Sequence, residues 1–136
     1  MHKAGWALAL TVLLATPVPG HAAATGVIFQ VSTNSPATWK VAVHNVRNLE
    51  RATGMPGNRI EVVVFSRAAR MLLKDSPVAP NLDALHASGV TIEACKASIR
   101  ETGLRLSAIL PFVRYVPSGV AEIVRRERQG WAYVRP

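Results

Sequence analysis

The chain has 136 residues, of which 49% are hydrophobic and 18% are charged. It contains 16 Lys and Arg residues and 8 Asp and Glu residues. This length allows one domain at most, and the apolar share is too high for a disordered basic tail. The single cysteine excludes a disulfide framework, a thiolate cage for zinc and an iron–sulfur cluster within one chain. The thiol of this cysteine is therefore either an inert packing group or a reactive group.

Residues 1–24 have the pattern of a secretory signal peptide. A short positive start at His2 and Lys3 is followed by an apolar run, a Pro-Gly break and small residues, which predicts cleavage after Ala22 or Ala24. The apolar run is too short to span a bilayer, so an uncleaved anchor is the weaker alternative. We therefore expect a periplasmic or secreted protein with no integral membrane segment after cleavage.

The basic excess survives this cleavage. Without Lys3 the remaining chain carries 15 basic and 8 acidic residues, for a net charge of +7. An exported protein meets anionic surfaces and small anions but little nucleic acid, so we expect no nucleic-acid partner.

The remaining residues, 25–136, alternate short β-rich runs with helical stretches, which is typical of an α/β domain. Strands are predicted at 27–31, 60–65, 90–94, 112–116 and 131–134. Helical segments are predicted from Pro36 to a stop at Gly54, over 67–74, from a cap at Asn81 to Gly89, from Cys95 to Gly103 and from a cap at Ser118 to Gly130. The almost continuously apolar second strand favours a parallel sheet, and the order predicts a three-layer α/β/α domain with five mainly parallel strands.

Cys95 is the main candidate for chemistry. It follows the third predicted strand and begins a helix, and ligands of open α/β sheets bind beyond the carboxyl ends of the strands. Helix-start amides and the neighbouring positive charge of Lys96 would favour the thiolate. Inert packing of a buried thiol is the alternative, and it would leave Cys95 fully covered.

Other polar residues are weaker candidates. Ser32 and Asn34, which follow the first strand, and Ser66, which follows the second, form a candidate pocket for a small polar group, although turn and capping roles explain the first loop equally well. No glycine-rich phosphate loop is present. His44 and His86 lack partners at ligand spacing, so we expect no metal site.

Two features of the last third have plain explanations. Basic residues at 125, 126 and 128 complement the dipole of the last predicted helix, or form an anion or membrane patch. Trp131 and Tyr133 cover the edge of the sheet, or anchor a neighbouring subunit.

The sequence resembles the DsrE-like sulfur-relay family, and most of all its small exported members. The resemblance is carried by 89–98 (GVTIEACKAS), by Leu110-Pro111, and by 116–122 and 130–136 near the end of the chain. It implies a five-stranded, largely parallel sheet, assembly into trimers or hexamers, and no cofactor. Phe65-Ser66 stands where many relatives carry a His-Gly pair.

The resemblance also implies that Cys95 carries sulfane sulfur as a persulfide, accepting it from a donor and passing it to a thiol. We therefore expect a sulfurtransferase-like carrier outside the cytosol, not a partner in tRNA thiolation. Two alternatives remain: a non-catalytic oligomeric module that binds a small anionic ligand, and a thiol redox sensor.

Overall fold

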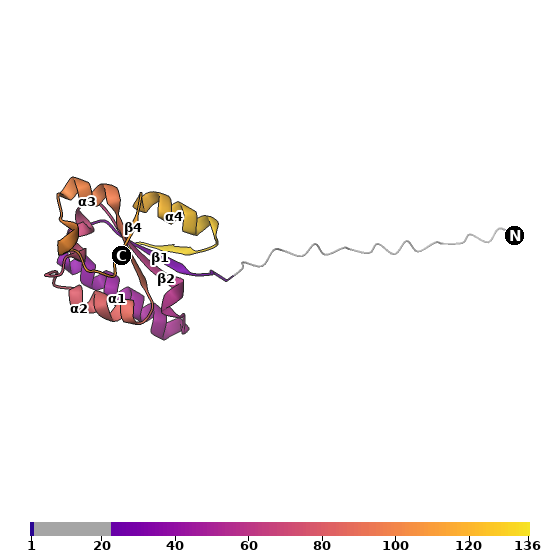
Figure 1. The fold of residues 1–136 in the computed structure, drawn as a ribbon. Coiled ribbons are helices and arrows are strands. Elements are labelled where there is room, and N and C mark those ends of the chain that lie inside the picture. The colour runs from indigo at the N-terminus through magenta and orange to yellow at the C-terminus, as the bar shows by residue number, and fades with distance from the viewer. Residues whose placement is uncertain (2–22) are drawn as a thin grey trace.

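The protein is described by a computed structural model, which covers Met1 and residues 23–136. A single five-stranded sheet forms its centre, and all its strands are parallel (Figure 1). The strands are β1 (Val27–Val31), β2 (Ile60–Val64), β3 (Thr91–Cys95), β4 (Arg114–Val116) and β5 (Ala132–Val134), in the spatial order β4-β3-β2-β1-β5. The sequence predicted a mainly parallel five-stranded sheet, and this is confirmed. The predicted signal peptide lies almost entirely outside the described residues.

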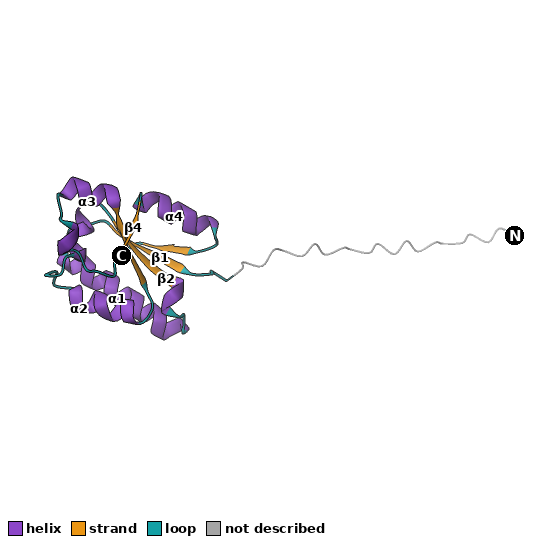
Figure 2. Cartoon of the chain, viewed as in Figure 1, coloured by secondary structure: helices purple, strands orange, loops and turns teal. Residues whose placement is uncertain are grey.

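Four α-helices connect the strands: α1 (Pro36–Thr53), α2 (Ala79–Ala87), α3 (Lys96–Thr102) and α4 (Gly119–Arg128). The described residues also form the short 3-10 helices η1 (Gly57–Arg59), η2 (Ser66–Leu72) and η3 (Leu106–Ala108). Figure 2 shows α1 and α2 on one side of the sheet and α4 on the other. The chain thus has the three layers that the sequence predicted.

The longest helix, α1, has clear signals at both ends. The side chain of Ser35 accepts a hydrogen bond from the amide of Thr38, and Pro36 occupies the first turn, where its missing N–H is not needed. Gly54 ends the helix with a φ of 67°, a left-handed conformation that glycine adopts without strain. These are the start and stop that the sequence predicted.

The two faces of the sheet differ in how they are covered. The face under α1 and α2 packs into a large apolar core that includes Trp39, Val46, Leu82 and Leu85. The face under α4 has a small apolar cluster of Ile28, Val63, Val116 and Ile123. Polar groups are therefore found between α4 and the sheet, where the apolar core is thin.

Three predicted elements are corrected by the structure. Helix α2 begins at Ala79, whereas the sequence predicted a start after a cap at Asn81. Pro80 lies in the first turn of the helix, where proline is favoured. The fourth strand begins at Arg114 and not at 112, since the amide of Val113 bonds back to Leu110 in a turn and the ring of Phe112 stacks on His86. The helical segment predicted at 67–74 is the 3-10 helix η2 (Ser66–Leu72), and it ends before Leu73, which forms a β-bridge with Ile109.

Candidate functional site

Cys95 lies at the carboxyl edge of the sheet. It is the last residue of β3, and it is also the residue that precedes the first turn of α3. Its Sγ lies 3.9 Å from the carbonyl oxygen of Pro117, two residues before α4 begins. The thiol is therefore placed where β3, α3 and the start of α4 meet.

Hydrogen bonds set the acidity of this thiol. Burial raises the pKa of Cys95, but hydrogen bonds from the Ser98 side chain and from the amides of Ser98, Gly119 and Ala97 lower it by more. The net pKa lies below the ordinary value of a cysteine. Amides from the starts of two helices thus favour the thiolate, as the sequence suggested for α3 alone.

The exposure of Cys95 is small, at 6%. Burial of this degree also suits an inert packing group. The groups that lower the pKa of Cys95 favour a reactive role instead, because an inert thiol gains nothing from groups that stabilise its anion. The thiol is nearly but not completely covered.

Lys96 is not among the groups that change the pKa of the Cys95 thiol most. Its side chain is exposed and lines a groove of about 340 Å³ with Ile99, Leu104, Leu106 and Tyr115, among others. The groups that lower the pKa most are the hydrogen-bond donors named above. A contribution of Lys96 to thiolate stability therefore stays a prediction.

Phe65 and Ser66 stand where the family resemblance implies a His-Gly pair. Phe65 packs where a side chain at Gly119 would have to be, because a Cβ added there would lie 2.6 Å from Phe65 Cδ1. Ser66 has a φ of 55°, the only positive φ of a non-glycine residue among the described residues. Ser66 thus keeps the left-handed backbone that glycine normally supplies.

The three residues of the predicted pocket are only partly brought together. Asn34 and Ser66 both line a cavity of about 600 Å³, which Arg67, Arg70, Glu101 and Thr102 also line. Ser32 does not line it, and its hydroxyl accepts a hydrogen bond from Gln30 instead. The two arginines were not singled out in the sequence.

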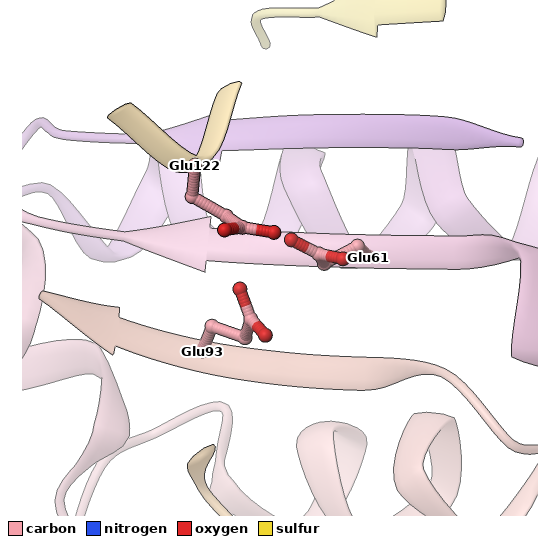
Figure 3. Close-up of side chains that lie close together, drawn as sticks. All are labelled: Glu61, Glu93 and Glu122. Carbon is pink, nitrogen blue, oxygen red and sulfur yellow. The ribbon is translucent and has the colours of Figure 1, made fainter. Parts of the chain in front are cut away.

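Three buried glutamates lie between α4 and the sheet, and the sequence analysis missed them. Glu61 projects from β2, Glu93 from β3 and Glu122 from α4, and Figure 3 shows their carboxylates turned toward one another. One carboxylate oxygen of each lies within 4.8 Å of the others. Glu61 is fully buried and Glu93 is 4% exposed.

Two arginines of α4 neutralise this carboxylate cluster. Arg126 Nη2 lies 2.6 Å from Glu61 Oε2, and Arg126 Nε lies 3.2 Å from Glu122 Oε1. Neither contact is a well-directed hydrogen bond, because both Glu61 oxygens and Arg126 Nε lack a hydrogen-bond partner. Arg125 forms a second ion pair with Glu122.

The protonation of the cluster follows from its burial. Burial, and after it the neighbouring Glu93, raise the pKa of Glu61, Arg126 lowers it, and the net value is about 8. For Glu122, the hydrogen bond from Arg125 lowers the pKa more than burial raises it. Glu61 therefore keeps its proton at neutral pH, which removes most of the repulsion between it and Glu93.

The cluster fits a metal ion poorly. Three carboxylates are a donor set that hard cations accept. Here Arg126 already contacts two of the three, Arg125 occupies Glu122, and Glu61 is protonated at neutral pH. A cation would have to displace a guanidinium and a proton, so we assign the cluster to the seating of α4.

A signal for this cluster was present in the sequence. Glu61 and Glu93 are the charged residues of two buried, mainly apolar strands, and a charged residue in a strand buried on both faces must have a buried partner. The partner Arg126 was assigned to the helix dipole instead. Trp131 covers its guanidinium, whose Cζ lies 4.2 Å from the ring centroid.

The remaining candidates are at the surface. His44 and His86 are exposed, and the ring of His86 stacks on Phe112 at 4.4 Å. Tyr133 is 40% exposed and donates a hydrogen bond to Gln30. Among residues 23–136, no helix has the length and apolar character needed to cross a bilayer.

Solved structures with the same fold come from archaea and bacteria. The protein of unknown function MTH1491 from Methanobacterium thermoautotrophicum is 35% identical, with a TM-score of 0.76 over 81% of this chain and 97% of its own. The ychN protein from E. coli is 11% identical, with a TM-score of 0.67 over 82% of this chain and 99% of its own. BT1422 from Bacteroides thetaiotaomicron is 17% identical, with a TM-score of 0.64 over 82% and 95%.

A search of curated proteins gave no match. The sequence profile of the DsrE/DsrF-like family, in contrast, matches residues 25–136, which include every strand and helix described above. MTH1491 supports the same grouping, because it is similar in sequence as well as in fold. The chain belongs to the DsrE/DsrF-like family.

Proposed function

We propose that this protein carries sulfane sulfur on Cys95 as a persulfide and passes it to an acceptor thiol. The observation that carries the proposal is the set of hydrogen bonds from Ser98, Ala97 and Gly119, which lowers the pKa of the Cys95 thiol despite its burial. A thiolate is the nucleophile that such a transfer requires. Membership of the DsrE/DsrF-like family supports the same activity.

The transfer needs one cysteine in each chain. The Cys95 thiolate attacks the outer sulfur of a donor such as thiosulfate, so an S–S bond forms to Cys95 while the S–S bond of thiosulfate breaks. Sulfite leaves with the bonding electron pair. An acceptor thiolate then attacks the same outer sulfur, and Cys95 leaves as a thiolate. The cycle is redox-neutral and uses no cofactor.

Each neighbouring residue has a proposed part in this cycle. The Ser98 hydroxyl and the amides of Ala97 and Gly119 stabilise Cys95 as attacking and as leaving thiolate. Lys96 follows Cys95 directly in the chain, and its exposed positive charge attracts an anionic donor. Because only a small fraction of Cys95 is exposed, only small donor molecules reach the thiol. The same burial shields the persulfide from bulk solvent.

We further propose that the protein works outside the cytosol as a homo-oligomer. The support for export is the signal-like pattern of residues 1–24. The support for assembly into a trimer or hexamer is the resemblance to the sulfur-relay family. In that compartment the donor and the acceptor are small molecules or exported thiol proteins.

The test is intact-mass spectrometry of the purified chain after incubation with thiosulfate or polysulfide. The proposal expects the mass of one added sulfur atom, its absence in Cys95→Ser and its removal by an acceptor thiol. No added sulfur, or equal addition in Cys95→Ser, would sink the proposal and favour the non-catalytic binding module.

A second measurement tests the hydrogen bonds themselves. Ser98→Ala removes the side-chain donor, so the pH midpoint of Cys95 alkylation should rise and sulfur loading at neutral pH should slow. The control is Ser107→Ala, which changes an exposed serine in η3, away from the thiol. An equal midpoint in wild-type protein and in Ser98→Ala would mean that Ser98 does not tune the thiol.

A further inference from the structure

A cavity lined by Arg67 and Arg70 lies near the carboxyl edge of the sheet. It has a volume of about 600 Å³, and its walls come from the loop after β1, from η2 and from the end of α3. Ligands of parallel α/β sheets bind at this edge. Its lining residues are Asn34, Ser66, Arg67, Arg70, Glu101 and Thr102.

The two arginines are held side by side. They are three residues apart in the 3-10 helix η2, and side chains at this spacing in a 3-10 helix lie directly above one another. The helix itself is firmly anchored, because Ala68, Ala69 and Met71 are fully buried. Two like charges thus line one wall of the cavity.

No acidic side chain neutralises this pair. Among residues 23–136, the ion pairs involve Arg125 and Arg126 alone, and neither Arg67 nor Arg70 takes part in one. Glu101 is the single acid in the lining, and it forms no ion pair with them. The cavity therefore carries an unsatisfied positive charge, in contrast to the neutralised cluster under α4.

The rest of the lining supplies neutral hydrogen-bonding groups. Asn34 offers an amide, and Ser66 and Thr102 offer hydroxyls. The strained backbone of Ser66 is fixed by its own amide, which donates to Ser98 Oγ at 2.7 Å. Two arginines together with neutral polar groups are a usual means of binding a multiply charged oxyanion.

We infer that this cavity binds a small dianionic oxyanion of the sulfate and thiosulfate class, held by Arg67 and Arg70. The inference goes beyond the proposed function, because binding of the anion does not require the thiol. The cavity is nonetheless next to the thiol. Ser98, which lowers the pKa of Cys95, also accepts the hydrogen bond from Ser66 in the cavity wall.

The test is isothermal titration of the full folded chain with sodium sulfate and with sodium thiosulfate. Sodium chloride keeps the ionic strength constant, so that general screening does not change. We expect saturable binding with one site per chain. Arg67→Gln and Arg70→Gln should each weaken binding about tenfold or more, because each removes a charged hydrogen bond.

Two control variants make the test specific. Arg128→Gln removes an exposed arginine from α4, and Cys95→Ser removes the thiol. Both should bind sulfate, which has no sulfane sulfur to transfer to Cys95, as the wild-type chain does, so binding and sulfur loading fail or succeed separately. The inference is overturned by the absence of saturable binding, by equal binding in the double variant of Arg67 and Arg70, or by an equal weakening in Arg128→Gln.

Discussion

Gly119 is the residue at which the start of α4 touches both Phe65 and Cys95. Its amide is one of the donors that lower the pKa of Cys95, and its missing side chain leaves the space that Phe65 fills. In the family resemblance a histidine takes the place of Phe65. In this chain an apolar ring therefore lies against Gly119, where the resemblance implies a polar one.

Replacing Gly119 with alanine should disturb both stability and the thiol. The new Cβ would lie 2.6 Å from Phe65 Cδ1 and 3.2 Å from Phe65 Cβ, so the ring or the helix must shift. We expect the free energy of unfolding in urea to fall by about 1–3 kcal/mol. We also expect the pH midpoint of Cys95 alkylation to rise, because the Gly119 amide moves away.

The matched control is Val120→Ala, one residue further along α4, where the side chain is 58% exposed. Its unfolding free energy should stay within about 0.5 kcal/mol of wild type. Unchanged alkylation in Gly119→Ala would contradict the role of this amide.

At the scale of elements, α4 is a helix held by charge more than by apolar burial. Ile123 is its one buried apolar side chain, whereas Glu122 and Arg126 form ion pairs in the layer between α4 and the sheet. Trp131, just after the helix, covers the guanidinium of Arg126. Because α4 also begins beside Cys95, the seating of this helix and the environment of the thiol are coupled.

Glu61→Gln tests this electrostatic seating through pH. The pKa of Glu61 is about 8 in the folded protein and 4.5 ordinarily, so the unfolded chain loses the proton first as pH rises. The contribution of Glu61 to the free energy of unfolding is therefore largest below about pH 4.5. It falls as the pH rises toward 8 and is constant above that pH. Glutamine stays neutral and should remove this fall.

The measurement is urea unfolding at pH 6 and pH 8. Between these values the wild-type chain should lose about 2 kcal/mol more than Glu61→Gln, since each unit of pH corresponds to at most about 1.4 kcal/mol for one proton. Glu127→Gln, on the exposed side of α4, is the control and should follow wild type. Identical pH dependence in wild type and Glu61→Gln would show that Glu61 is ionised throughout.

At the scale of the whole molecule, the proposed assembly cannot depend on a disulfide. Cys95 is 6% exposed at the junction of β3, α3 and α4, and two such thiols cannot approach to bonding distance without local unfolding. The trimer or hexamer should therefore have the same mass by light scattering with and without reductant, and in Cys95→Ser. A mass that falls on reduction would instead support the thiol redox sensor.

The sequence predicted what depends on neighbouring residues. Capping and glycine stops identified α1, and alternating strands and helices identified a parallel sheet with Cys95 at its carboxyl edge. The strand order, with β5 returning beside β1, depends on long-range packing and was not predicted. The same holds for the carboxylate cluster, since Glu61, Glu93 and Arg126 come together only after the sheet forms and α4 crosses it.

The segment before β1 lies at the amino ends of the strands, whereas the chain leaves β5 at their carboxyl ends. Thr25 bonds to Gly130 and Gly26 to Ala132, which ties the segment before β1 to the amino edge, whereas β5 runs parallel to β1 toward the carboxyl edge. A five-residue strand separates these edges by about 16 Å. A dye or affinity tag ahead of Thr25 would thus stand clear of Cys95 and the arginine cavity, while one after Pro136 would be attached on their side.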